Sequence, residues 1–311
     1  MTIRAPEGCV NIAQITDLHL PAWEGFGWRD ALNKRVTGWV NHRLSRHGAH
    51  DPHLIQRAVD ALVEIRPDLT LITGDVTNVS LASEFRRVAS ALEPLVKAGL
   101  PTAYIPGNHD LYVPDALDGR VENLLNAHLH ADVRPGPTFP YVKRVGQVSV
   151  LLLNSAHPAP PLFAWGRLDD AQLASTASLL AAERAEGQGL MVALHHHPTA
   201  APHRRVDFHR GLRGGRRLLD LCAAHQVQLV VHGHNHRHEL RWWEGDQGQR
   251  VLICGLGSTS LRLDQRAEIG FSTWTGPSLS ALRFARWDDR ADAFTPALSL
   301  TPGEVTRVLR G

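Results

Sequence analysis

Cysteine, long apolar runs and net charge are all scarce in this chain of 311 residues, and each shortage excludes a class of protein. Its three cysteines, Cys9, Cys222 and Cys254, are widely spaced and form no CxxC pair, so we interpret them as reduced structural thiols. No apolar stretch is long enough to span a bilayer, and the first ten residues lack the apolar run of a secretory signal. We therefore expect a cytoplasmic protein, with contact to a membrane surface left open.

The charge balance argues against a nucleic-acid partner. Lysine and arginine total 33 against 31 acidic residues, which gives a net charge of +2. Hydrophobic residues make up 43% of the chain and charged residues 21%. This composition supplies a sizeable core and does not indicate disorder.

Short apolar runs rich in β-branched residues alternate with segments of helical periodicity. Strands are predicted at Val10–Thr16, Leu69–Thr73, Thr102–Ile105, Tyr141–Val145, Val148–Asn154, Leu190–Leu194, Val227–Val231, Val251–Cys254 and Leu282–Trp287. Helices are predicted at Pro52–Ile65, Leu81–Lys97, Ala171–Glu186 and Gly211–His225. The alternation predicts a layered α/β protein with mixed sheets, and we expect one domain over residues 1–311.

Five short motifs rich in metal ligands each follow a predicted strand. They read Asp17-Leu18-His19, Gly74-Asp75, Gly107-Asn108-His109-Asp110, His195-His196-His197-Pro198 and Gly233-His234-Asn235-His236. Each motif alone is more often an ordinary turn beside a solvated histidine. All five together, each at a strand end, predict a site for two metal ions.

The residue types suit transition metals. Asp17 and His19 are two positions apart, as are His234 and His236, so on extended backbone each pair faces one side. Asp75 has two carboxylate oxygens and is the natural bridge between two ions. Imidazole and carboxylate together favour Zn, Mn, Fe or Ni over Ca or Mg.

At these residues the chain resembles the calcineurin-like metallophosphoesterase superfamily, whose motifs are DxH, GD, GNH[DE], HxP and GHxH. The resemblance covers Asp17 to His236 and implies a four-layer α/β/β/α sandwich, with the dinuclear site at the strand ends. It also implies two sets of metal ligands. One ion would take Asp17, His19, Asp75 and His236, and the other Asp75, Asn108, His196 and His234.

The histidine triplet leaves one ligand open. The family motif places the ligand two residues before the proline, which selects His196. Strand alternation would then turn His195 and His197 to the other side, and His197 could contact the substrate. A shift of register would make His195 the ligand instead.

The expected chemistry is attack on phosphorus by a hydroxide that bridges the two ions, without a protein nucleophile. His109 follows the ligand Asn108 and is the candidate general acid, while Asp110 could orient it. The alternative for His109 is a hydrogen bond that stabilises a turn. Purple acid phosphatases carry a tyrosine ligand three residues after the GD aspartate, where this chain has Asn78, so a tyrosinate–iron site is not expected.

Three segments could select the substrate. Trp23 lies in a loop after the first motif, where it could stack on a base or simply anchor the loop. Residues 31–47 form a basic amphipathic pattern that could cap the site or touch an anionic membrane, although packing on the domain is the more common role. Arg204 and Arg205 could clamp a phosphate or be solvated.

The leading hypothesis is therefore a metal-dependent phosphoesterase, with a phosphodiester preferred over a monoester on the family resemblance. A second hypothesis is a pyrophosphatase that cleaves a lipid-linked substrate of the UDP-2,3-diacylglucosamine type at the membrane surface. A nucleic-acid-binding protein and a non-catalytic metal-binding scaffold are the weaker, non-enzymatic alternatives.

Overall fold

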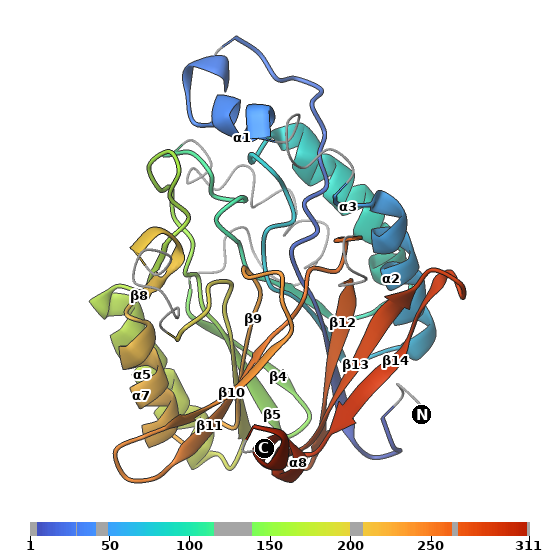
Figure 1. Ribbon diagram of the computed structural model, residues 1–311. Helices are drawn as coiled ribbons and strands as arrows, with labels where there is room; N and C mark the ends of the chain where they lie inside the picture. Colours follow the sequence, from blue (N-terminus) through green and yellow to red (C-terminus); the bar gives the residue numbers. More distant parts are fainter. Residues whose placement is uncertain are drawn as a thin grey trace.

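The computed structural model describes residues 5–28, 30–41, 49–114, 139–199, 208–262 and 267–309. Its main elements are two six-stranded sheets that pack face to face (Figure 1). The first sheet has the order β14 (Ala293–Leu300), β13 (Ser278–Asp288), β12 (Glu268–Thr275), β1 (Val10–Ile15), β2 (Leu69–Ile72) and β3 (Thr102–Tyr104). Strands β1, β2 and β3 are parallel, and the other pairs are antiparallel.

The second sheet has the order β10 (Glu239–Glu244), β11 (Arg250–Gly255), β9 (Leu229–His232), β7 (Gly189–Ala193), β5 (Val148–Leu152) and β4 (Tyr141–Val145). Its four inner strands are parallel, and the two edge pairs are antiparallel. A separate two-stranded sheet joins β6 (Gly166–Arg167) to β8 (Leu212–Arg213). Both large sheets are therefore mixed, as predicted.

Helices cover the outer face of each sheet (Figure 1). The first sheet carries α2 (Pro52–Ile65) and α3 (Ala82–Lys97), and the second carries α5 (Asp170–Ala185) and α7 (Gly215–Ala224). Buried side chains of both sheets, such as Ile12 and Leu229, form the core between them. The predicted four-layer α/β/β/α sandwich is confirmed.

Local sequence explains why α2 begins at the predicted residue and which of its sides is buried. Asp51 accepts a hydrogen bond from the amide of His53, and Pro52 occupies the first turn, where its missing N–H is not needed. Its buried apolar residues recur at helical spacing and pack on the first sheet; they are Leu54, Ile55, Ala58, Val59 and Leu62. Burying each large side chain contributes about 1.5–3 kcal/mol.

Strands β10, β12 and β14 and the helix α8 (Pro302–Val308) were not predicted from the sequence. Strand β14 contains Pro296, which is unusual within a strand. Strand β12 is buried on both faces, so its polar and apolar residues do not mark an inner and an outer side. Pairing with β1 and β13 stabilises these segments, and a local pattern does not reveal such pairing.

The segment predicted as a helix over 31–47 is divided in the structure. Its described part consists of the short helix η1 (Asp30–Leu32) and α1 (Arg35–Asn41), and residues 42–48 lie outside the described chain. Arg35 of this segment packs on the domain, because its side chain is buried and donates to the carbonyls of Val79 and Ser80. Figure 1 places α1 at the end of the molecule opposite α8.

None of the described helices is long and apolar enough to cross a membrane.

Candidate metal centre

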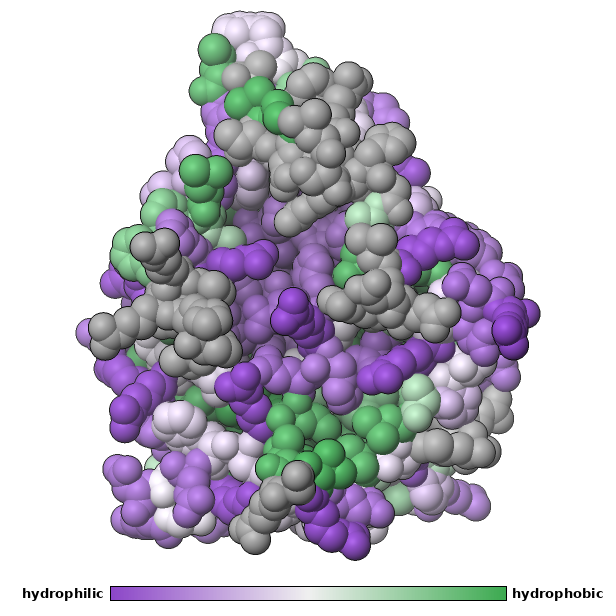
Figure 2. All heavy atoms as spheres, in the orientation of Figure 1, coloured by the Kyte–Doolittle hydropathy of each residue, from purple (hydrophilic) through white to green (hydrophobic). Residues whose placement is uncertain are grey.

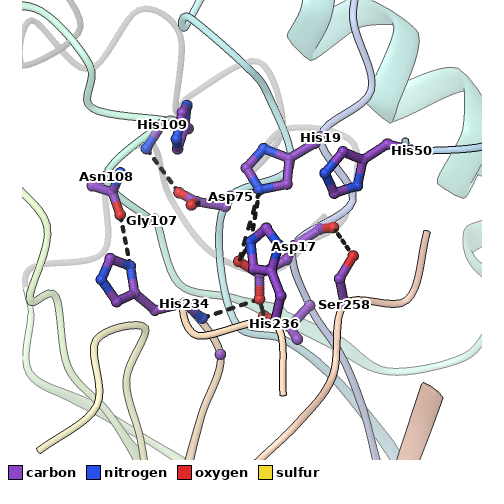
Figure 3. Close-up of polar contacts among 12 residues, drawn as sticks. Asp17, His19, His50, Asp75, Gly107, Asn108, His109, His234, His236 and Ser258 are labelled. Atoms are coloured by element: carbon purple, nitrogen blue, oxygen red, sulfur yellow. Dashed lines mark hydrogen bonds and ion pairs between the residues drawn. The ribbon is translucent and has the colours of Figure 1, made fainter. Parts of the chain in front are cut away.

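All five motifs lie directly beyond the carboxyl ends of parallel strands, namely β1, β2, β3, β7 and β9. Loops at this end of neighbouring parallel strands meet at one edge, so ligands far apart in sequence come together. Figure 3 shows the side chains of Asp17, His19, Asp75 and His236 directed toward one another, with Asn108 and His234 beside them. In the orientation of Figure 1, hydrophilic side chains lie over the centre of the visible face of the molecule (Figure 2).

The first group of ligand atoms belongs to Asp17, His19 and His236. His236 Nε2 lies 3.1 Å from Asp17 Oδ1 and 3.2 Å from His19 Nε2. His19 Nε2 lies 3.9 Å from Asp17 Oδ1 and 3.8 Å from Asp75 Oδ2. These separations suit side chains that share one ion.

The second group belongs to Asp75, Asn108, His195 and His234. His195 Nε2 lies 3.3 Å from both Asp75 Oδ2 and Asn108 Oδ1. His234 Nδ1 lies 3.0 Å from Asn108 Oδ1 and 3.3 Å from His195 Nε2. The Oδ2 atom of Asp75 thus lies between both groups, in the position of a bridging ligand.

The structure brings His195 into this group and not His196. Strand β7 ends at Ala193, so the triplet is not extended and the alternation used in the prediction does not apply. His196 is fully buried and contacts the Ser155 hydroxyl through Nδ1 at 2.9 Å. The structure thus groups His195, the alternative that the sequence left open, with Asp75 and His234, and we take His195 in place of His196 as the ligand in the proposal below.

Backbone carbonyls set the tautomers of three imidazoles. His19 Nδ1 donates to Thr77 O, and His195 Nδ1 donates to Thr73 O. His234 donates through Nε2 to Arg210 O. Each ring therefore turns its other nitrogen toward the shared centre, as metal-binding histidines do.

This arrangement fits divalent metals. Ring nitrogens 3.2–3.3 Å apart need either a proton or a cation between them, and the surrounding imidazole and carboxylate groups suit a divalent metal. Burial lowers the pKa of His19 and of His234 well below the usual value, which keeps both in the neutral form that binds metal. Burial opposes the charged form of His195, but the Asp75 carboxylate outweighs it and raises the pKa of His195 to about 9, so a metal ion binding here would displace a proton from the ring.

Five of these residues have left-handed backbone conformations: Asp17, His19, Asp75, His234 and His236 have φ angles between 45° and 70°. Such conformations are uncommon outside glycine and cost about 1–2 kcal/mol each. They also explain why the DxH and HxH pairs converge. The chain has left its strand and turns each side chain inward, so the proximity of each pair comes from these turns and not from strand alternation.

His109 is held beside the centre by Asn78. The ring donates from Nδ1 to the carbonyl of Asn78 at 2.6 Å and stacks on Tyr112 at 5.3 Å between centroids. A ligand atom each of His109, His19 and Asp75 lie within 4.8 Å of one another. The other ring nitrogen, Nε2, is therefore the one available for chemistry.

Asp110 has a different role from the one predicted. Its carboxylate accepts hydrogen bonds from the amides of Gly107 and Thr77 and from the Thr77 hydroxyl. Burial, with the nearby Asp75, raises its pKa to about 6. Asp110 thus ties the GD and GNHD loops together, and the contact that orients His109 comes from Asn78.

The predicted substrate-binding residues have separate locations. Trp23 packs on the apolar cluster that includes Val79 and Tyr112, which favours the loop-anchoring alternative. His197 is buried and stacks on His234 with centroids 5.7 Å apart. Arg204 and Arg205 lie outside the described residues.

Two residues near the centre were not assigned to it from sequence. The ammonium of Lys34 lies 4.3 Å from the centroid of Tyr112 and donates to the carbonyl of Phe163. Burial lowers its pKa to about 8. His50 lies beside His19, with ring centroids 4.6 Å apart (Figure 3). Lys34 belongs to the segment 31–47, which the sequence offered as a possible cap of the site, whereas His50 belongs to no motif and only the fold brings it here.

Comparison with known proteins identifies this arrangement. The family model of calcineurin-like phosphoesterases matches residues 10–238, which include every motif described above. The chain belongs to the calcineurin-like phosphoesterase family. It is accordingly a metal-dependent phosphoester hydrolase whose site takes two divalent ions.

Relatives of similar length carry related descriptions. A probable cyclic nucleotide phosphodiesterase of Psychrobacter sp. (strain PRwf-1) is 23% identical over 86% of this chain and 84% of its own length. One from Psychrobacter arcticus is 23% identical over 78% and 80%. The 3',5'-cyclic adenosine monophosphate phosphodiesterase CpdA of Vibrio vulnificus is 27% identical over 65% and 61%.

Solved structures share the fold at low identity. A dimetal phosphatase from Danio rerio superposes with a TM-score of 0.60 and 13% identity, over 94% of this chain and 98% of that one. A purple acid phosphatase from yellow lupin gives a TM-score of 0.60 and 12% identity, over 96% of this chain and 55% of that one. The side-chain amide of Asn78 donates to the carbonyl of His19, so Asn78 links the loop after β2 to the loop after β1.

Proposed function

We propose that this calcineurin-like phosphoesterase hydrolyses phosphodiesters, with 3',5'-cyclic nucleotides as the substrate class. The observation that carries the proposal is the imidazole of His109, held by Asn78 at the edge of both ligand groups. A ribose oxygen is a strongly basic leaving group, and its departure from phosphorus needs a proton donor. The descriptions of the Psychrobacter and Vibrio relatives support the same substrate class.

Each ion has its own set of ligands in this proposal. One would be held by Asp17, His19, Asp75 and His236, and the other by Asp75, Asn108, His195 and His234. The nitrogen and oxygen donors suit Mn, Fe or Zn. When bound, the two ions supply an activated water and neutralise charge on the phosphoryl oxygens.

The protein supplies the geometry and the proton. Because Nδ1 of His109 donates to Asn78 O, the proton on Nε2 is the one to be transferred. It would pass to the ribose oxygen as water oxygen bonds to phosphorus and the P–O bond breaks, so the ring opens to one nucleoside monophosphate that carries a freed hydroxyl. Lys34, over the ring of Tyr112 on which His109 stacks, adds positive charge that suits an anionic substrate.

The lipid-linked pyrophosphatase is not favoured. Lys34 and Arg35, which lie in the described part of the segment 31–47, face the protein, since Lys34 donates to Phe163 O and Arg35 to Val79 O. They are thus directed away from an anionic membrane. The relatives compared above are described as cyclic nucleotide phosphodiesterases and not as lipid pyrophosphatases.

A substrate panel on metal-reconstituted protein tests the proposal. We expect turnover of 3',5'-cAMP or 3',5'-cGMP, and of bis(p-nitrophenyl) phosphate well above p-nitrophenyl phosphate. Asp75→Ala should abolish all of it, whereas His53→Ala, which changes an exposed histidine outside the motifs, should not. Hydrolysis of monoesters with no turnover of any cyclic nucleotide would refute the proposed substrate class.

A further inference from the structure

A third imidazole faces the group formed by Asp17, His19 and His236. In the sequence, His50 follows the segment 31–47 and precedes α2, and it belongs to none of the five motifs. One ligand atom each of His19, His50 and His236 lie within 4.8 Å of one another. Two ligands on opposite sides of an ion lie about 4.2 Å apart when each bond is about 2.1 Å long. The 4.8 Å limit exceeds this distance by about 0.6 Å, so side-chain rotations of that size would let one ion join the three rings.

His50 is held in place by the segment 258–262. It pairs with Leu261 in an antiparallel bridge, flanked by hydrogen bonds from Asp51 N to Ser260 O and from Arg262 N to Ala49 O. These contacts fix the backbone on both sides of His50. The ring position is thus part of the fold and does not depend on an exposed loop.

Hydroxyl groups of the same segment set the tautomer of His50. Ser258 and Ser260 both donate to the carbonyl of Asp17, at 2.7 and 3.1 Å (the Ser258 bond is drawn in Figure 3). His50 Nδ1 lies 2.7 Å from the Ser260 hydroxyl, and when Ser260 donates to Asp17 its oxygen accepts from this nitrogen. The ring lone pair of His50 is then on Nε2. His19 and His195 have the same pattern, with Nδ1 donating and Nε2 turned to the centre.

We propose that His50 is a further protein ligand of the ion held by Asp17, His19 and His236. This inference rests on the proposed bimetallic site and adds a neutral donor to one half of it. An added imidazole shifts the preference of that half toward Fe, Zn or Co and away from Mg. Ser260 is its positioning residue, because it sets the tautomer through Nδ1.

Metal binding measured without substrate tests this proposal. Apo protein is titrated with Co²⁺, with calorimetry for the two dissociation constants and visible absorption for the ligand field. For His50→Ala and His50→Asn we expect one constant to rise at least 10-fold, the other to stay within about 2-fold, and the absorption of one ion to change. Ser260→Ala should weaken the same constant about 10-fold or more.

His53→Ala is the matched control, because His53 is three residues away, half exposed and paired with Asp292 at 2.7 Å. It should leave both constants and the spectrum unchanged. If wild-type protein binds fewer than two ions, the proposed function fails. If wild-type protein binds two ions and both His50 variants bind them with unchanged dissociation constants and spectra, only the role of His50 is overturned. A His50 variant with a raised KM and unchanged metal binding would overturn that role as well.

Discussion

Gly107 provides a sharp test of the close packing behind the metal centre. A Cβ at this position would overlap Asp75 Oδ1 and the Asp75 backbone nitrogen, and would lie 2.8 Å from Asp75 Cγ. Ordinary contact between heavy atoms needs about 3.5 Å, so Gly107→Ala requires a shift of roughly 1 Å. Rotating Asp75 away would break its hydrogen bond from His109 N. It would also withdraw Oδ2 from between His19 and His195.

The magnitude follows from this geometry. Overpacking of a rigid site costs about 1–3 kcal/mol of unfolding free energy. A displacement of about 1 Å in catalytic groups costs on the order of 100-fold in rate. We therefore expect Gly107→Ala to lower kcat/KM for a phosphodiester about 100-fold and to weaken metal binding, with a folded protein at room temperature.

The assay combines kcat/KM, thermal unfolding and elemental analysis of reconstituted protein. Gly303→Ala is the matched control, because a Cβ there meets no atom closer than 4.0 Å and lies within α8. Alanine in a helix is favoured over glycine by about 0.5–1 kcal/mol, so this variant should be fully active and no less stable. Full activity and two metal equivalents in Gly107→Ala would refute the packing argument.

Three further predictions concern the assigned residues. His195→Ala should lose one of the two metal equivalents whereas His196→Ala should retain both, and the reverse result in elemental analysis would restore His196 as the ligand. His109→Ala should retain both metals and slow turnover about 10²–10⁴-fold, most strongly for esters with basic leaving groups; an equal loss across a leaving-group series would remove His109 from the acid role. Burial raises the pKa of Glu84 from 4.5 to about 7, so the folded protein binds this proton more tightly than the unfolded chain. Its contribution to stability is thus present at low pH and is lost as pH rises through 7. Relative to Glu84→Gln, wild-type protein should lose about 2 kcal/mol of unfolding free energy between pH 5 and 7.5, and parallel pH profiles in chemical denaturation would contradict this.

Much of the fold could be predicted from local pattern. The helix Pro52–Ile65 was predicted with its observed bounds, because Asp51, Pro52 and the apolar spacing all act within a few residues. Strands β1, β2 and β9 are short apolar runs and were found with small errors at their ends. Strands β12 and β14 could not be found this way, since their stability comes from partners far along the chain.

The site divides in the same way. Motif spacing predicted that Asp17, His19, Asp75 and Asn108 lie close together, because each follows directly after a recognisable strand, and the structure places them so. The choice between His195 and His196 depended on where β7 ends, and alternation fails once the strand has stopped. The partner of His109 depended on how the loop after β2 packs against the loop after β3, which no spacing reveals.

By itself, the sequence determined the class of chemistry, because carboxylate, amide and imidazole groups at strand ends define a bimetallic donor set in any layered α/β fold. Only the tertiary structure decided which nitrogen faces the centre, which histidine of the triplet takes part and that His50 lies beside His19. Donor type is a property of single residues, whereas orientation depends on backbone carbonyls and hydroxyls contributed by distant segments. Such contacts exist only after the two sheets have packed together.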